Sequence, residues 1–135
     1  MKAMANTSEI LRKYRTIAVV GLSPNRMRPS YGVSDYMKRA GYRIIPVNPG
    51  HSEILGEKSY RTLDEVPDAI DIVNVFRRSE YVPEIADIAI RKGAKVLWLQ
   101  EGVAHDEAAE KARAAGLEVV MDTCILKEHR KLRIA

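Results

Sequence analysis

Short apolar runs alternate along the chain with longer amphipathic stretches. The runs are rich in β-branched residues, and each is about as long as an ordinary strand. They cover residues 16–20, 43–47, 70–75, 96–99 and 117–121. The amphipathic stretches have the length and composition of helices, and several stop at a glycine, which is typical of a helix end. They cover residues 8–14, 34–40, 83–92, 107–115 and 124–131.

Strands that alternate with helices predict right-handed βαβ units and a mostly parallel sheet. Pro46 lies inside the second run; because proline donates no backbone hydrogen bond, it favours an edge strand, a bulge or a strand end. Residues 48–61 are predicted to form a loop, since they contain Pro, Gly, His and Ser. The length of 135 residues is that of one ordinary domain. We therefore predict that residues 1–135 form a single α/β domain, a doubly wound sheet of five strands with helices on both faces.

Composition narrows the class of function. No apolar run is long enough to cross a membrane, the first ten residues lack the apolar segment of a secretory signal, and the single cysteine, Cys124, fits a reducing compartment. We therefore expect a cytoplasmic protein.

The net charge of +4 favours an anionic partner. Dispersed basic residues with one Phe and one Trp argue against nucleic acid. His51, His105 and His129 lack the spacing of a metal site and are expected at the surface or at helix caps.

Small, polar or conformationally special residues follow each predicted strand. In an open α/β sheet, ligands bind beyond the carboxyl ends of the strands, near the point where the strand order reverses. The candidate residues are therefore Gly21–Ser23, Asn48–Pro49, Phe76–Arg77, Gln100–Gly102 and Asp122–Cys124.

The loop after the first strand is the most informative of these. Gly21 ends a buried strand, and such a turn presents backbone N–H groups and a helix N-terminus to an anion. Ser23 and Ser30 add hydroxyl groups, and Arg26 and Arg28 add charges that can bind phosphate oxygens bidentately. The alternative is that Gly21 only makes the turn and the arginines are solvated. Similarly, Phe76 could stack on an adenine or pack in the core.

This loop is not a dinucleotide fingerprint. The G-x-G-x-x-G pattern needs glycines where Ser23 and Arg26 stand. An NAD site also has an acidic residue at the end of the second strand to bind the ribose, whereas this chain has Val47, Asn48 and Pro49 there. No P-loop and no Ser-His-Asp constellation can be identified. The pattern therefore favours a nucleotide ligand other than NAD.

Several segments, in the same order, resemble the small stand-alone CoA-binding proteins. The resemblance extends from about residue 10 to residue 132, and the combination is more specific than any one segment. The segments are 20–24 (VGLSP), 28–30 (RPS), 41–49 (GYRIIPVNP), 71–77 (DIVNVFR), 98–102 (WLQEG), 122–124 (DTC) and 128–129 (EH).

The resemblance implies a Rossmann-like fold, shared with the CoA-binding domain of the succinyl-CoA synthetase α subunit, and coenzyme A across the carboxyl edge of the sheet. It implies that the first loop holds phosphates, that the second-strand end lines the adenosine or pyrophosphate, and that Cys124 lies near the reactive arm. One departure is Thr123, where the family often has Arg. The residues expected around coenzyme A are Gly21, Leu22, Ser23, Arg26, Arg28, Ser30, Val47, Asn48, Pro49, Phe76, Arg77, Gln100, Gly102 and Cys124.

Three hypotheses follow, of which the first is preferred. The chain is a non-catalytic module that binds coenzyme A or an acyl-CoA, acting with a protein partner or as a homo-oligomer. Alternatively, it is an enzyme that acts on a CoA thioester with Cys124 or Asp122 in a catalytic role. Thirdly, it is an NAD(P)-binding redox protein, against which the missing glycines and ribose acid count. The ligase activity of the synthetase is not expected, because the 135 residues leave no room for the domain that carries its phosphohistidine.

Overall fold

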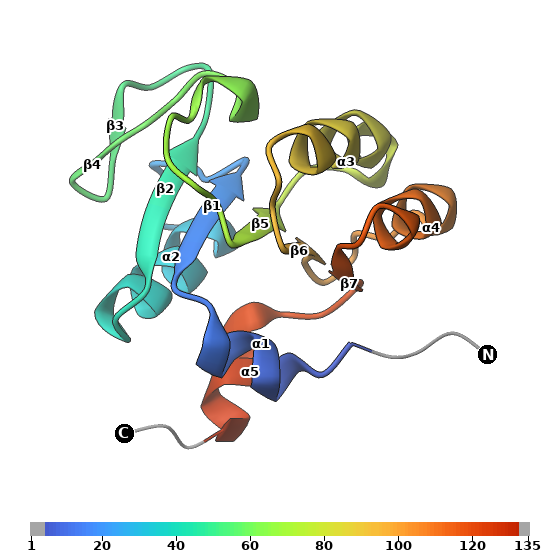
Figure 1. The fold of residues 1–135 in the computed structure, drawn as a ribbon. Helices are drawn as coiled ribbons and strands as arrows, with labels where there is room; N and C mark the ends of the chain where they lie inside the picture. Colours follow the sequence, from blue (N-terminus) through green and yellow to red (C-terminus); the bar gives the residue numbers. More distant parts are fainter. Residues whose placement is uncertain (1–4, 133–135) are drawn as a thin grey trace.

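Five parallel strands form the central sheet (Figure 1). The computed structural model describes residues 5–132. The spatial order of the strands is β2 (Arg43–Val47), β1 (Thr16–Val20), β5 (Ile72–Val75), β6 (Val96–Leu99) and β7 (Glu118–Val120). Every neighbouring pair is parallel. The predicted doubly wound sheet is confirmed, and Pro46 lies in an edge strand, where its missing donor costs no interior ladder bond.

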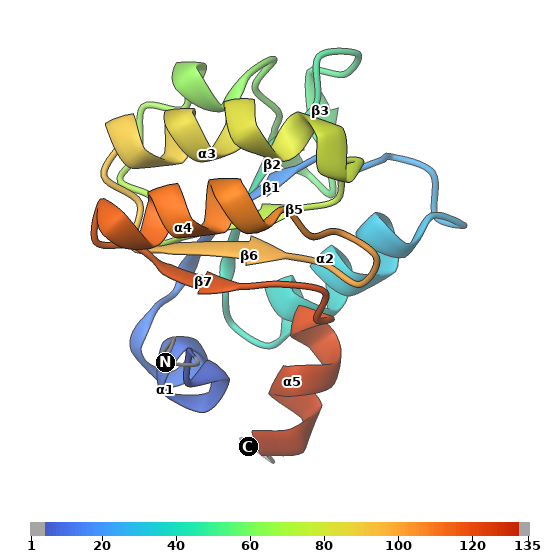
Figure 2. The ribbon, with the colours of Figure 1, turned by 90° about the vertical axis from the view of Figure 1, so that its right-hand side faces the viewer.

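Helices cover both faces of this sheet (Figure 2). One face carries α3 (Val82–Arg91) and α4 (Asp106–Ala114), and the other carries α1 (Thr7–Lys13), α2 (Pro29–Arg39) and α5 (Ile125–Leu132). Successive strand residues point to opposite faces, so each strand contributes to two apolar cores. Ala18 and Leu97 belong to the core beneath α3 and α4. Ile17 and Trp98 belong to the core beneath α1, α2 and α5.

Helix α2 begins at Pro29, five residues before the start predicted from the sequence, so that boundary was wrong. Proline is well suited to the first helical position, because its missing N–H is not needed there. The early turn also contains Ser30 and Gly32, which are weaker helix formers and conceal the start. As a result, the N-terminus of α2 lies close to the carboxyl edge of the sheet.

The segment 48–61, predicted as an irregular loop, contains a small hairpin. Its strands are β3 (Glu53–Ile54) and β4 (Glu57–Lys58). Leu55 and Gly56 have φ values of 56° and 74°, which are the positive angles that a two-residue type I′ turn requires. Lys38 fixes the hairpin to α2: its Nζ donates to the Leu55 carbonyl at 2.6 Å and pairs with Glu57 at 3.0 Å. Short 3₁₀ turns at Leu63–Glu65 and Ser79–Tyr81 complete the connections.

The helix α5 is anchored by His129, which was expected at the surface or at a helix cap and is instead buried within the helix. Its Nδ1 is hydrogen-bonded to the Tyr36 hydroxyl at 2.8 Å, and its ring meets the rings of Tyr36 and Tyr42 edge-on. The prediction was wrong because aromatic partners that lie far away in sequence enclose the imidazole. Burial lowers the pKa of His129, and the positive charge of Arg15 lowers that pKa further.

The other two histidines lie as predicted. His105 is the N-cap of α4, where its Nδ1 accepts from the Ala108 N–H at 3.1 Å, and His51 is exposed. Within residues 5–132, no three metal-ligating side chains form a candidate metal site. No helix in that part of the chain is long and apolar enough to cross a membrane.

Candidate functional site

The candidate site lies at the carboxyl ends of β1 and β5, where the connections that leave the two strands run in opposite directions. From β1 the chain crosses to β2 on one side, and it then returns to β5 on the other side of β1. This is the reversal of strand order at which doubly wound sheets bind ligands. A cavity of about 520 Å³, which we call the main pocket, opens there between the start of α2 and the loops that follow β6 and β7. A second cavity of about 290 Å³, the side pocket, lies beside α3.

One wall of the main pocket comes from the β1–α2 loop and the first turn of α2. Gly21, Ser23, Arg28 and Ser30 line it. Gly21 has φ +90°, and a Cβ there would lie 3.0 Å from both Arg77 Cδ and the Phe76 carbonyl oxygen, so the position requires glycine. Arg28 is exposed and precedes α2 directly, which places a cation and the positive end of the helix dipole at the same wall.

Most of the loop amides that were expected to hold phosphate bind within the protein. The Gly21 N–H donates to the Val47 carbonyl at 3.0 Å, and the Ser23 N–H donates to Ser30 Oγ at 3.0 Å. Asn25 N–H in turn donates to Ser23 Oγ at 3.1 Å. These bonds hold the loop in shape, so the capacity to bind an anion rests mainly on Arg28 and the α2 N-terminus.

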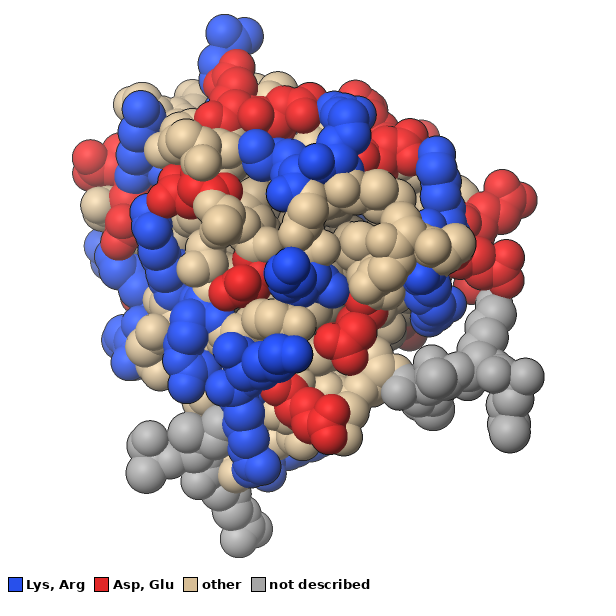
Figure 3. Space-filling view, in the orientation of Figure 1, with Lys and Arg blue, Asp and Glu red and all other residues tan. Residues whose placement is uncertain are grey.

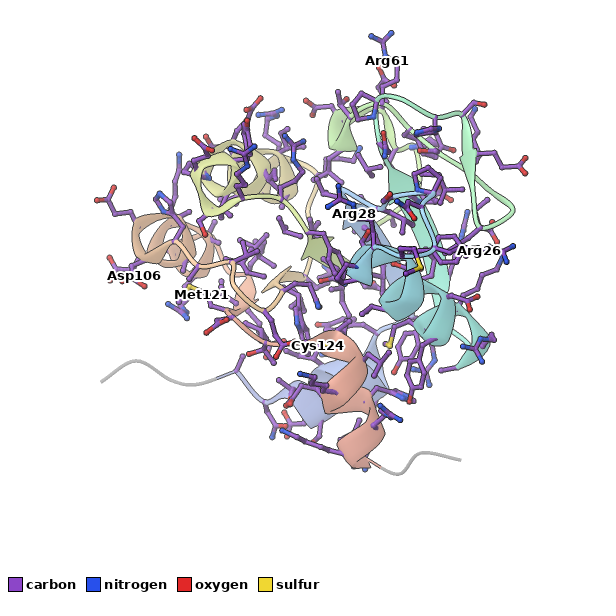
Figure 4. All side chains as sticks on the ribbon, turned by 180° about the vertical axis from the view of Figure 1, so that it is seen from behind. Arg26, Arg28, Arg61, Asp106, Met121 and Cys124 are labelled. Atoms are coloured by element: carbon purple, nitrogen blue, oxygen red, sulfur yellow. The ribbon has the colours of Figure 1, made fainter. Side chains whose placement is uncertain are left out.

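The opposite wall comes from the loops after β6 and β7, and it includes Gln100, Glu101 and Cys124. These two loops are bonded to each other. Gln100 Oε1 accepts from the Ile125 N–H at 3.0 Å, and Asp122 Oδ1 accepts from the Gly102 N–H at 2.6 Å. The buried thiol of Cys124 lies immediately before α5 (Figure 4).

Phe76 and Arg77, although consecutive, serve different cavities. Phe76 lines the main pocket and Arg77 lines the side pocket, because neighbouring residues at a strand end point to opposite faces. The Arg77 guanidinium lies over the Tyr81 ring, 4.3 Å from its centroid. Val47 and Pro49 line the side pocket with them, as does Arg61, which extends outward from the loop after the hairpin (Figure 4).

Not every expected site residue lines a cavity. Leu22 is fully buried in the core, Arg26 projects into solvent, and Gly102 lies beside the main pocket without lining it. Asn48 is a clamp between loops: its Nδ2 donates to the Leu22 carbonyl at 2.9 Å, and its Oδ1 accepts from the Gly50 N–H at 2.8 Å.

Some residues that line the two pockets were not predicted from the sequence. In the main pocket they are Pro29, Val33 and Val103, and in the side pocket they include Arg61 and Tyr81. Glu101, in contrast, lies inside the candidate segment 100–102 and lines the main pocket. Arg61 and Tyr81 follow no strand of the central sheet, so no local signal in the sequence marks them.

Comparison with known proteins decides the family. Residues 15–130 match the family described as the CoA binding domain. The chain belongs to this family. Membership supports binding of coenzyme A in general, and the match covers both walls of the main pocket and the residues of the side pocket.

Relatives of this CoA-binding domain fall into two groups. The uncharacterized protein YneT of Bacillus subtilis is 46% identical over 125 residues, which cover 93% of each chain. A solved structure, a hypothetical protein from Pyrococcus horikoshii, is 37% identical with a TM-score of 0.91, covering 98% of this chain and 99% of that one. In contrast, the α subunit of the ADP-forming acetate–CoA ligase I of Pyrococcus furiosus is 30% identical over 95 residues, which cover 66% of this chain and 21% of the subunit. This chain therefore corresponds to about one fifth of that subunit.

Proposed function

We propose that this chain binds coenzyme A, free or acylated, across the carboxyl edge of its sheet, and that it acts as a small non-catalytic CoA-binding protein. The observation that carries the proposal is a pair of cavities at the carboxyl edge of the sheet, one lined by Gly21 and the other by Arg77, two residues that lie close to each other. Their volumes of about 520 and 290 Å³ together fall within the range of small-molecule sites. An elongated ligand with a nucleotide at one end and a flexible arm at the other fits this arrangement.

In the proposed orientation, the adenosine occupies the side pocket. Pro49 and the stacked pair of Arg77 and Tyr81 offer flat surfaces to a purine ring. Arg61 and Arg77 are available to phosphate groups on that side, and Arg28 with the α2 N-terminus is available on the other. The pantetheine arm then extends through the main pocket toward Gln100 and Cys124.

The non-catalytic part of the proposal rests on the groups at the thiol end. Only three ionisable side chains line the main pocket in the described chain: Arg28, Glu101 and Cys124. Glu101 is paired with Lys127 at 2.9 Å, and no histidine lines this pocket. The acetate–CoA ligases are much longer chains, so their activity belongs to a larger assembly. A binding module of this kind passes its ligand on through a protein partner or a second copy.

Calorimetry with coenzyme A, dephospho-CoA, NAD and ATP tests the ligand. We expect coenzyme A to bind most tightly, because NAD and ATP lack the arm that fills the main pocket and dephospho-CoA lacks the 3′-phosphate that an arginine can bind. NAD bound as tightly as coenzyme A would refute the assignment. The same protein incubated with acetyl-CoA, with free thiol measured over time, tests the absence of turnover. Thiol released catalytically, many times per protein molecule, would favour the enzyme hypothesis instead.

A further inference from the structure

The two walls of the main pocket carry opposite charges. Arg28 is the charged residue in the wall formed by the β1–α2 loop and the first turn of α2. Glu101 is the charged residue in the opposite wall, formed by the loops after β6 and β7. No other charged side chain of the described residues lines this cavity. A ligand that lies across the pocket therefore has its phosphates near a cation and its far end near a carboxylate.

The carboxylate of Asp122 adds negative charge near Glu101. Asp122 Oδ1 is bonded to the N–H of Gly102, which directly follows Glu101. Lys127 offsets part of this charge, because its Nζ binds both carboxylate oxygens of Glu101 at 3.1 and 2.9 Å. Together, Glu101, Asp122 and Lys127 carry one net negative charge, although Asp122 does not itself line the pocket. The Glu101 and Lys127 side chains are 55% and 61% exposed, so water and salt weaken the field without removing it.

We propose that the main pocket selects a free thiol or an uncharged acyl thioester and disfavours an acyl group that ends in a carboxylate, with Glu101 as the residue that determines this specificity. The inference rests on the proposed function, because it takes the pantetheine arm to end near Cys124. An acyl chain attached there extends beside Glu101, where a terminal carboxylate meets a like charge. A terminal methyl group meets no such repulsion and contacts the apolar side chains Val33 and Val103 instead.

Butyryl-CoA and succinyl-CoA provide the test, because their acyl chains have the same length and differ in the terminal carboxylate. In calorimetry at low ionic strength, we expect the wild-type protein to bind butyryl-CoA about three- to fivefold more tightly, as partly exposed charges are worth up to about that factor. Added salt should reduce the ratio, because it screens the repulsion. Equal affinity, or tighter binding of succinyl-CoA at low salt, would overturn the proposal.

Two variants should move this ratio in opposite directions. Glu101→Gln removes the carboxylate and releases Lys127, so the ratio should fall to about one or reverse in favour of succinyl-CoA. Lys127→Met leaves Glu101 without its partner, so the ratio should rise above that of the wild type. A merely structural role for the pair would change both affinities together and leave the ratio constant.

Glu118→Gln is the matched control. Glu118 is an exposed glutamate at the first position of β7, at the amino edge of the sheet and therefore far from the pocket. Its substitution should leave the ratio at the wild-type value, and a ratio that shifts as much as with Glu101→Gln would overturn the local explanation. If the wild type binds neither coenzyme A nor either thioester, the proposed function itself fails, which is a result distinct from binding without discrimination.

Discussion

Arg28 is an exposed side chain for which we propose a role in binding and none in folding. It lines the main pocket and makes no side-chain cap bond to α2. Arg77 differs, because its stem packs close to Gly21 and its guanidinium lies over Tyr81. The same residue type therefore has two different local roles at the two ends of one site.

Substitution of these arginines tests the phosphate contacts. We expect Arg28→Ala and Arg77→Ala each to weaken coenzyme A binding about ten- to a hundredfold, since a charged hydrogen bond is worth about 1.5–3 kcal/mol. Neither should lower the melting temperature much, although Arg77→Ala should cost slightly more than Arg28→Ala because it removes packing. Arg39→Ala is the control, an exposed arginine at the last position of α2. Unchanged affinity with a large loss of stability would mean that these residues are structural.

Cys124 has two roles open to it, packing and thiol chemistry. The proposed orientation brings the ligand thiol to its vicinity, so we expect incubation with CoA disulfide to give a covalent adduct. The Cys124 thiolate attacks one sulfur of the disulfide, a new S–S bond to CoA forms, and one CoA thiol leaves. Intact mass measurement should detect the added CoA, and a reductant should remove it.

Cys124→Ser is the control for that reaction and should acquire no CoA. A wild-type thiol that stays unmodified after prolonged incubation would leave Cys124 as a small buried side chain, which is the common fate of a lone cysteine.

At the scale of elements, α5 links the main pocket to the aromatic side chains that enclose His129. Its first residue, Ile125, is bonded through its N–H to Gln100 in the main pocket. One turn later, His129 is enclosed by Tyr36 and Tyr42. Thr7 of α1 donates to Glu128 Oε1 at 2.9 Å. The helix is thus held from three sides, and its position affects the wall that contains Cys124.

The burial of His129 predicts how stability depends on pH. Its pKa in the folded state is lowered from the ordinary value of 6.5, by burial first and by Arg15 second. The unfolded chain therefore takes up the proton first as the pH falls. The stabilisation is complete above pH 6.5 and declines below it. Urea unfolding at pH 7.5 and at pH 5 should show lower stability at the acidic pH.

Two variants separate His129 from the other histidines. His129→Gln cannot take up this proton, so the difference in unfolding free energy between pH 7.5 and pH 5 should shrink. His51→Gln removes an exposed histidine and should keep the wild-type difference. Glu128 does not confuse the result, because its pKa is lowered from 4.5, mainly by its bond to Lys131, and it titrates below this pH range. A wild-type stability that is flat over the range contradicts the argument.

How far the sequence predicts these elements depends on how local their causes are. The strands are predicted well, because β-branched apolar runs such as residues 16–20 are a local signal. The start of α2 was missed, because Pro29 and Ser30 are ambiguous until the sheet provides a partner for the helix. The hairpin was missed because Leu55 takes a positive φ that is unusual for its type. The burial of His129 depends on residues more than 80 positions away, as the bond between Tyr36 and His129 illustrates.

At the scale of the whole molecule, the topology predicted where the cavities lie better than it predicted which residues line them. The rule that ligands bind beyond the carboxyl ends of the strands located both cavities. It did not separate residues that line them, such as Arg28, from residues that support them, such as Leu22 and Asn48. That distinction depends on the direction of side chains at loop ends, which sequence spacing does not determine.

On the molecular surface, acidic and basic side chains are mixed rather than gathered into patches of one sign. Acidic and basic side chains interleave over most of the face shown in Figure 3, and the net charge of the chain is only +4. Long-range attraction of an anionic ligand is therefore modest. In the proposed function, recognition of coenzyme A therefore depends on a few individual side chains, chiefly Arg28, Arg61 and Arg77.

The divergence of Phe76 and Arg77 to opposite faces of the sheet has a thermodynamic consequence. A ligand that occupies both cavities is attached at two points that are joined by its own covalent chain. Once one half has bound, the other half is held near its cavity at a high effective concentration, so the whole molecule binds far more tightly than either half alone. Selectivity then comes from the length of the connection as much as from either end. A fragment such as 3′,5′-ADP or pantetheine competes poorly even when it fits its own cavity well.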